Sequence, residues 1–308
     1  MTASRTVAHT GDEVEIEGRR VRLTSLDRVV WPLTGTTKRD LIEYLLAAAP
    51  ALLSHVRGRP TMLWRFPEGI DGPGWFQAQC RSRPDWVPTH EVIGKRGERL
   101  AYCVIKEPAT LAWLANLGTI EFHPFGWTVE RPTEPTALVL DLDPGPPACL
   151  VDCARVALRA RELLNSLALE PVVKTSGGLG LHVAAPLAAG QSFERAKTVA
   201  REIADQLADA LPQLVVRDIG REKRRGHVYV DWIQNDANRQ LVAAYSPRAT
   251  PIPQVSTPLL WEEVEHVATT GRDAALRPTP RSVLDRIERF GDLWLGEPRE
   301  RGGVLPAI

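Results

Sequence analysis

The chain has 308 residues, of which 44% are hydrophobic, and its 38 basic residues equal its 38 acidic residues in number. This composition predicts a folded globular protein with a substantial core and excludes a disordered chain. A net charge of zero excludes a general attraction to nucleic acid or membranes, so a site for a polyanion has to be a local cluster.

Targeting signals are not evident in the sequence. The apolar stretch 41–53 is interrupted by Glu43 and Pro50 and falls short of the ~20 residues that span a bilayer. No segment near Met1 has the basic and then apolar profile of a signal peptide. We therefore expect a cytoplasmic protein with no membrane partner.

The N-terminal third predicts a mixture of small elements. Residues 13–23 alternate polar and apolar side chains around a glycine, which indicates a hairpin. Thr37 and Asp40 form a capping-box pattern before an amphipathic helix. Residues 59–89 are rich in Pro, Gly and Trp and predict short strands and loops, and a second helix is expected over 111–117.

The remainder predicts a sheet with long helices. We expect helices over 148–167 and 192–210, and strands over 136–143, 171–175, 181–187 and 227–233. Because these elements lack a strict βαβ rhythm, the prediction is an α+β core of mainly antiparallel sheets flanked by helices. We expect one domain over 1–290, in which an N-terminal part (about 1–110) packs on a core (about 111–290), and a loosely ordered tail over 291–308.

The four cysteines, at positions 80, 103, 149 and 153, form no CxxC pair. A spacing of four places Cys149 and Cys153 on one side of the predicted helix. This arrangement favours core packing over half of a zinc site.

Two acidic residues end the apolar run "ALVLDLDPG". Side chains alternate along a strand, so Asp141 and Asp143 share a face with Val139, and the leucines between them face the opposite layer. Two carboxylates ~6 Å apart at an effective dielectric near 20 repel each other by about 3 kcal/mol, unless a proton or a cation lies between them. Paired divalent cations held in this way assist in-line attack on phosphate.

Asp231 in "HVYVDWI" is again a charge inside an apolar strand, and we interpret it as the third ligand. The alternative is that these acids cap strand ends or pair with arginines. A DxD pair alone also occurs in sugar-nucleotide transferases and in haloacid-type phosphatases.

A glycine-rich hairpin is predicted over 172–187, with its turn at residues 176–180. Glycines let backbone amides approach a phosphate closely. Lys174, Ser176 and His182 add a cation, a hydroxyl and an imidazole at this turn. The alternative is a structural hairpin with an incidental histidine.

An arginine-rich cluster precedes the third acid. Its basic residues are Arg217, Arg221, Lys223, Arg224 and Arg225. Guanidinium groups at the start of a strand that carries a metal ligand could neutralise a triphosphate, although such runs are more often a solvated surface.

Taken together, these motifs resemble the archaeo-eukaryotic primase superfamily, specifically the polymerase domain of bacterial ligase D and its stand-alone relatives. The resemblance covers about residues 21–290. Its motifs are "SLDRVVWPLTGTTKRDLIEYL", "RPTMLWRFPEGIDGPGWF", "NLGTIEFHP", "LVLDLDPG", "KTSGGLGLHV", "RRGHVYVDWIQN" and "YSPRATPIPQVSTPLLW".

The resemblance implies a role for each matched residue. Two divalent ions, Mn²⁺ in preference to Mg²⁺, would be held by Asp141, Asp143 and Asp231. The incoming NTP or dNTP would contact His123, Ser176, His182, Arg224 and Arg248. A 5′-phosphate on DNA would contact Lys38 and Arg28, which stands where the family usually has lysine, and template bases would stack on Trp75 or Phe76.

The implied function is nucleotide addition, with ribonucleotides preferred, to a primer 3′-hydroxyl at gaps or ends during DNA repair and non-homologous end joining. The expected location is the bacterial nucleoid. Because no ligase or nuclease motif follows, sealing is expected to need a separate ligase and an end-binding protein. Gln77 and Ala78 depart from the family's acidic residue and lysine. The alternatives are a haloacid-type phosphatase and a non-catalytic module that binds 5′-phosphorylated DNA ends.

Overall fold

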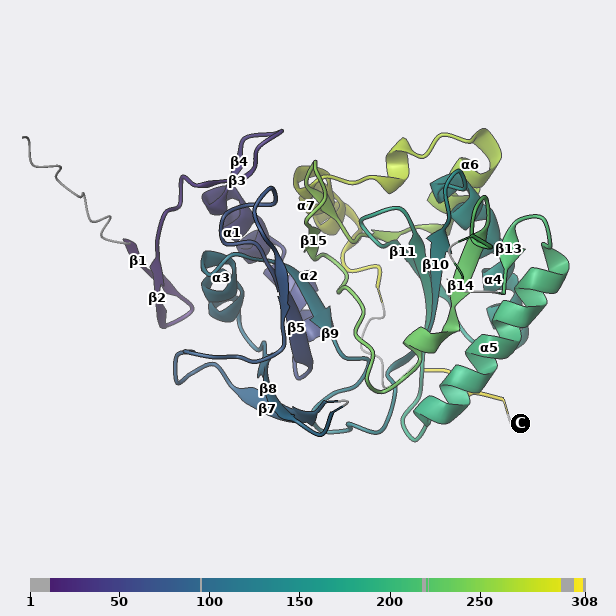
Figure 1. Ribbon diagram of the computed structural model, residues 1–308, viewed down its shortest axis with the longest axis horizontal. Helices are drawn as coiled ribbons and strands as arrows, with labels where there is room; N and C mark the ends of the chain where they lie inside the picture. Colours follow the sequence, from purple (N-terminus) through teal and green to yellow (C-terminus); the bar gives the residue numbers. More distant parts are fainter. Residues whose placement is uncertain (1–11, 95, 218–219, 221, 295–301, 307–308) are drawn as a thin grey trace, which may run out of the picture.

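The computed structural model describes residues 12–94, 96–217, 220, 222–294 and 302–306, and Figure 1 shows two halves side by side. The N-terminal half carries three helices, α1 (Lys38–Ala47), α2 (Ala49–Val56) and α3 (Pro108–Asn116). Its main sheet contains β5 (Pro60–Arg65), β6 (Trp75–Gln77), β7 (Thr89–Ile93), β8 (Arg99–Val104) and β9 (Thr119–Pro124). Two hairpins precede it, β1 (Asp12–Ile16) with β2 (Arg19–Leu23) and β3 (Val29–Trp31) with β4 (Thr36–Thr37).

The second half is built on a six-stranded sheet in the order β13-β14-β10-β12-β11-β17. Its strands are β10 (Ala137–Pro144), β11 (Val172–Thr175), β12 (Leu181–Pro186), β13 (Val215–Val216), β14 (Val228–Asp231) and β17 (Pro258–Leu259). The helices of this half are α4 (Leu150–Ser166), α5 (Phe193–Ala210) and α6 (Trp261–Thr270). All pairings except β13 with β14 are antiparallel, which confirms the predicted α+β class.

The chain then returns to the N-terminal half. The short strands β15 (Pro247–Arg248) and β16 (Gln254–Val255) pair between the two halves, and α7 (Pro280–Phe290) packs on α1. Two short 3₁₀ helices, η1 (Trp232–Gln234) and η2 (Ala274–Leu276), complete the elements. Figure 1 shows β15 and α7 between the halves.

The predicted alternation along β10 is confirmed. Leu138, Leu140 and Leu142 are fully buried in the core that the sheet shares with α4 and α5. Val139, on the opposite face, packs against the core of the N-terminal half. The carboxylate face of β10 therefore points between the two halves.

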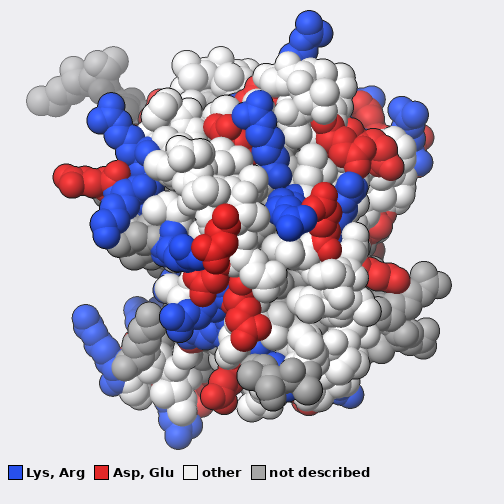
Figure 2. All heavy atoms as spheres, turned by 90° about the vertical axis from the view of Figure 1, so that its right-hand side faces the viewer, with Lys and Arg blue, Asp and Glu red and all other residues white. Residues whose placement is uncertain are grey.

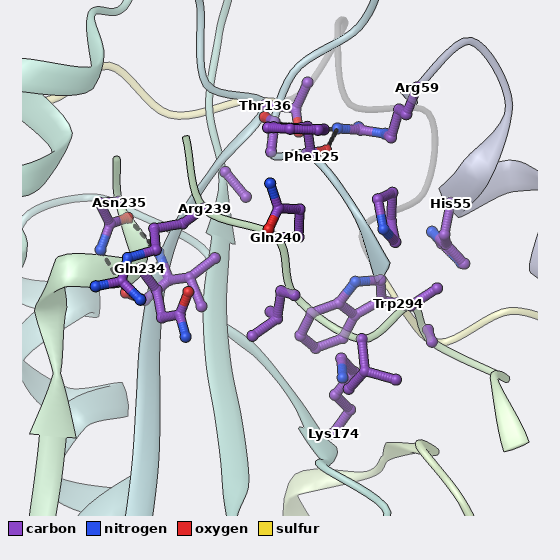
Figure 3. Close-up of a pocket in the computed structure, with 18 of the residues that line it drawn as sticks. His55, Arg59, Phe125, Thr136, Lys174, Gln234, Asn235, Arg239, Gln240 and Trp294 are labelled. Carbon is purple, nitrogen blue, oxygen red and sulfur yellow. Dashed lines mark hydrogen bonds between the residues drawn. The ribbon is translucent and has the colours of Figure 1, made fainter. Parts of the chain in front are cut away.

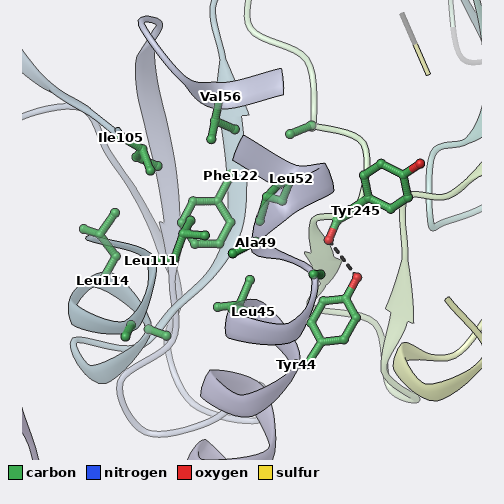
Figure 4. Packing of buried hydrophobic residues seen from close by; sticks show 14 of the residues in the cluster. Tyr44, Leu45, Ala49, Leu52, Val56, Ile105, Leu111, Leu114, Phe122 and Tyr245 are labelled. Atoms are coloured by element: carbon green, nitrogen blue, oxygen red, sulfur yellow. Dashed lines mark hydrogen bonds between the residues drawn. The ribbon is translucent and has the colours of Figure 1, made fainter. Parts of the chain in front are cut away.

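The N-terminal core is anchored by α1, whose predicted capping box is present at Thr37 and Asp40. Figure 4 shows Leu45 and Phe122 packed within this core, and the Tyr44 hydroxyl donating a 2.9 Å hydrogen bond to the Tyr245 carbonyl. Burial raises the pKa of Tyr44 well above its usual value, so the phenol remains a donor. This bond joins α1 to the segment that leads into β15.

Several boundaries differ from the predictions. Strand β9 pairs with β5, so the N-terminal half continues beyond residue 110. Strand β14 ends at Asp231, two residues early, because the Asp231 side chain accepts a hydrogen bond from Ile233 N and starts η1. Trp294 and Leu305 are buried, so the described part of 291–308 is packed rather than loose, and 295–301 and 307–308 lie outside the described residues.

The cysteines behave differently from the prediction. Cys153 is buried, but Cys149 is exposed because α4 begins only after it, with Cys149 as the N-cap. Cys80 and Cys103 form a disulfide that ties the loop after β6 to β8.

The outer surface of the second half carries both signs of charge. Figure 2 shows basic and acidic side chains interspersed on the side that faces right in Figure 1, without a patch of one sign. None of the described helices is long and apolar enough to cross a membrane.

Candidate active site

A row of four polar side chains crosses the six-stranded sheet. In the strand register, Asp231 on β14 is opposite Asp141 on β10, Asp141 is opposite His182 on β12, and His182 is opposite Lys174 on β11. Residues directly opposite each other project from the same face. The register thus brings together residues from four strands, of which only β11 and β12 are close in the sequence.

Contacts within the row link its members. His182 Nε2 lies 3.2 Å from Asp141 Oδ1, and Lys174 Nζ lies 2.7 Å from His182 Nδ1. Lys174 Nζ also donates to Ser256 Oγ at 2.6 Å. Burial lowers the pKa of both Lys174 and His182 well below their usual values.

Lys174 therefore occupies a different place from the one predicted. It is 1% exposed and lies behind His182, because its strand position directs it into the space between the halves rather than toward the glycine turn. Figure 3 shows it below the Trp294 ring, in an internal cavity of about 90 Å³ whose wall also includes His55 and Gln240. The Lys174 Nζ to Trp294 ring distance is 5.4 Å.

Asp143 lies two residues along the same face as Asp141, and Arg224 Nη2 contacts it at 3.2 Å. Arg224 also lies over the Tyr229 ring at 4.4 Å. From the predicted arginine-rich cluster, Arg224 is brought into the site, whereas Arg217 pairs with acids of α5. Arg221 lies outside the described residues.

The three aspartates oppose one another's ionisation. Burial raises the pKa of Asp141 to about 6, against the charges of Lys174 and other cations. Burial and the Asp141 charge raise the pKa of Asp143 and of Asp231. Such a site favours the binding of protons or cations.

The aspartates suit a divalent cation in their chemistry but not in their arrangement. Carboxylate oxygens are the donors that hard divalent cations prefer, and the register places three of them at neighbouring positions. Among the described residues, however, no three His, Cys, Asp or Glu side chains are arranged so that they could hold a metal ion. Asp231 instead caps η1 and Asp143 pairs with Arg224.

The glycine hairpin forms one wall of a cleft of about 660 Å³ above the aspartates. Seven of the predicted site residues line it, namely His123, Asp141, Asp143, Ser176, His182, Arg224 and Arg248. At the turn, Ser176 Oγ accepts hydrogen bonds from Gly178 N and Gly180 N, both at 3.2 Å. These two amides are already paired, contrary to the expectation of uncovered donors.

Glu121 was missed by the sequence analysis. Its Oε2 lies 2.8 Å from His123 Nε2 and 3.1 Å from Arg248 Nε. Burial lowers the pKa of His123, and Glu121 opposes that effect. The signal was available, because Glu121 is a charge within the apolar strand "TIEFHP", as Asp231 is in its own strand.

Two exposed aromatic rings lie on β6 of the N-terminal half. Trp75 is 45% exposed and Phe76 is 55% exposed, which suits the predicted stacking on bases. Phe76 stacks on Trp64 at 4.8 Å and meets His123 edge-on at 5.6 Å. The rings adjoin a second hollow of about 490 Å³ that includes Gln77.

Arg28 and Lys38 differ in accessibility. Lys38 is 6% exposed and its ammonium group donates to Thr24 O, Asn116 O and Asn116 Oδ1. Burial, with the nearby charge of Arg28, lowers the pKa of Lys38. Arg28 is 40% exposed and donates to Pro67 O.

Comparison with known proteins identifies the family of this chain. The protein-family model for "LigD, primase-polymerase domain" matches residues 37–294. The chain belongs to the LigD primase-polymerase domain family. The match includes every predicted site residue except Arg28.

Individual LigD proteins are also similar to this chain in sequence. The chain is 36% identical over 278 residues to "Multifunctional non-homologous end joining protein LigD" of Mycolicibacterium smegmatis, covering 89% of this chain and 35% of that protein. It is 31% identical over 292 residues to the Pseudomonas aeruginosa LigD of the same description, covering 94% of this chain and 34% of that protein. The chain thus spans about a third of the length of these relatives.

A solved LigD structure has the same fold. The polymerase domain of Mycobacterium tuberculosis ligase D, determined in complex with DNA, matches with a TM-score of 0.83 and 34% identity. The match covers 92% of this chain and 99% of that domain.

Proposed function

We propose that this chain is a DNA-directed primase-polymerase, a nucleotidyltransferase that extends a primer 3′-hydroxyl at gaps or breaks during repair by non-homologous end joining. One observation carries the proposal: Asp141, whose register partner on β14 is Asp231, lines a cleft whose walls hold Ser176, Arg224 and Arg248. Membership in the LigD primase-polymerase domain family supports the same reaction.

The basic and polar side chains of the cleft would bind the incoming triphosphate. Arg224 and Arg248 supply guanidinium groups, which bind phosphate oxygens in a bidentate manner. His182 and Ser176 lie between them on the hairpin strand and its turn. Charge that develops on the leaving pyrophosphate would be stabilised by these fixed groups.

We propose that Asp141, Asp143 and Asp231 hold two divalent ions, with Mn²⁺ preferred. Burial raises the pKa of all three carboxyl groups, and the nearby cations do not fully offset this effect. When bound, such ions supply activation of the primer hydroxyl and neutralisation of pyrophosphate. Asp143 would have to leave Arg224, which would free that guanidinium for the triphosphate.

The DNA substrate would lie across the exposed aromatic rings. Trp75 or Phe76 would stack on template bases, and Arg28 would contact the 5′-phosphate beyond a gap. Lys38 would join it only after giving up hydrogen bonds to Thr24 and Asn116. Preference for ribonucleotides, and cooperation with a ligase and an end-binding protein, belong to the same proposal.

Asp141→Asn and Asp231→Asn are expected to reduce nucleotide incorporation at least about 100-fold, because each removes a charge on which phosphoryl-transfer chemistry depends. The measurement is primer extension on gapped, nicked and unprimed DNA, with NTP or dNTP and with Mn²⁺ or Mg²⁺. The control is Asp205→Asn, an exposed acid on α5 that pairs with Arg217.

The experiment separates the alternatives. Incorporation near the wild-type level in both aspartate variants would reject the assignment. Binding of 5′-phosphorylated ends by wild type without incorporation under any metal condition would favour the non-catalytic module. Release of phosphate from small phosphoesters would favour the phosphatase, although Asp141, its required nucleophile, is only 8% exposed.

A further inference from the structure

Glu121 is a carboxylate in the middle of β9 with 1% of its surface exposed. Its neighbours Ile120 and Phe122 belong to the N-terminal core. Because side chains alternate along a strand, Glu121 and His123 project together toward the cleft. A buried carboxylate is costly unless it is paired, so its partners explain its presence.

Both oxygens of Glu121 are engaged by protein groups. Oε2 contacts His123 Nε2 and Arg248 Nε, and Oε1 accepts a 2.9 Å hydrogen bond from Ala249 N. Burial acts to raise the pKa of Glu121, but the hydrogen bond from His123 and the charge of Arg248 outweigh it and lower the pKa. Glu121 is therefore an anion that contacts protein on every side.

Arg248 continues from Glu121 to the other half of the molecule. Its Nη1 donates a 2.5 Å hydrogen bond to the carbonyl of Ser176, at the start of the glycine turn. The chain of contacts thus runs from β9, through one guanidinium group, to the hairpin of the six-stranded sheet. On the other side, His123 meets the exposed ring of Phe76 edge-on.

We propose that Glu121 is the positioning residue of the nucleotide pocket, which fixes His123 and Arg248 at their places in the cleft without touching the substrate itself. This inference rests on the proposed function. Arg248 has a long, flexible side chain. Without its anionic partner, this side chain would adopt several conformations. The nucleotide would then have to order Arg248 on binding, which weakens its affinity.

The test is Glu121→Gln, which keeps the shape and an acceptor for Ala249 N but removes the charge. We expect the KM for NTP on gapped DNA to rise at least about tenfold, while kcat and the KM for DNA stay within about threefold of wild type, as for lost ground-state binding. The matched control is Glu263→Gln, because Glu263 is a part-buried glutamate on α6 that also pairs with an arginine, Arg286 of α7, and does not line the cleft. It should leave all three constants unchanged.

The outcomes distinguish the two levels of the proposal. If wild type incorporates no nucleotide, the proposed function fails. If wild type is active and Glu121→Gln has the wild-type KM for NTP, the positioning role is wrong. It is also wrong if kcat falls and both KM values rise to a similar extent in Glu121→Gln. If Glu121→Gln does not fold, Glu121→Asp retains the charge at shorter reach, and an unchanged KM for NTP in that variant would also overturn the role.

Discussion

The three aspartates are the residues whose place in the molecule follows best from the sequence. Asp141, Asp143 and Asp231 each place a charge within an apolar strand. Because a charge in such a position costs free energy, its occurrence at three positions predicts a common function. The sequence alone does not predict how the neighbouring residues are arranged around these aspartates. Lys174 and His182 are both near the glycine turn, yet only the register with β10 places His182 beside Asp141 and Lys174 behind it.

A pH-dependent stability follows from Asp141. Burial raises its pKa from 3.8 to about 6, so the folded state binds this proton more tightly than the unfolded chain does. The stability that the proton contributes is present below pH 3.8 and is lost as the pH rises through about 6, by up to about 3 kcal/mol. Unfolding of metal-free protein measured between pH 4 and pH 7 should show this loss.

Asp141→Asn is the control for that measurement, because it removes the titrating group. We expect its stability to exceed that of wild type at neutral pH and the two to converge at low pH. Mn²⁺ at neutral pH should stabilise wild type more than the variant. Parallel stability curves for the two proteins across this range would contradict the explanation.

At the scale of elements, periodicity predicts the long segments well. Helix α5 and strands β10, β11 and β12 lie within one or two residues of the prediction. The ends of helices and strands are less predictable where a side chain fixes them. Asp231 ends β14 because it starts η1, and Cys149 caps α4 instead of joining the core. The Cys80–Cys103 disulfide has no signal in the cysteine spacing, because Cys80 lies in the loop after β6 and meets Cys103 on β8 only in the folded chain.

The glycine hairpin allows a matched test of close packing. A Cβ at Gly180 would lie 2.4 Å from the carbonyl oxygen of Leu142 on β10, whereas a Cβ at Gly178 would meet only Ser176 Oγ, at 3.5 Å. We expect Gly180→Ala to cost about 1–3 kcal/mol of stability and to raise the KM for nucleotide. Thermal unfolding and primer extension should find Gly178→Ala close to wild type, and equal effects of the two substitutions would refute the packing argument.

At the scale of the whole molecule, the net charge of zero, and the interspersed charge on the face in Figure 2, predict that the DNA of the proposed function would bind at a local site rather than along a basic surface. The antiparallel α+β class could be predicted from the sequence. The position of the division between the halves could not, because β9 follows the expected boundary but pairs with β5 through contacts between distant residues.

A preference for phosphorylated gaps should follow from Arg28, whose side chain is 40% exposed. We expect gapped DNA with a 5′-phosphate to bind about 10-fold more tightly than the same DNA with a 5′-hydroxyl, as for one charge-assisted contact. Arg28→Met should remove this difference in a binding titration. Arg20→Met, on the exposed edge of β2, is the control, and a difference that survives in Arg28→Met would place the phosphate elsewhere.

If the proposed function holds, the pairing of Asp141 with Asp231 would make catalysis depend on a single alignment between two strands. A slip of β14 by one residue would turn Asp231 toward the leucine core and bring a valine opposite Asp141, while the sheet kept most of its backbone hydrogen bonds. Such a molecule would be compact and soluble but inert. Specific activity per folded molecule is therefore a sensitive measure of whether this sheet has been assembled in its native alignment.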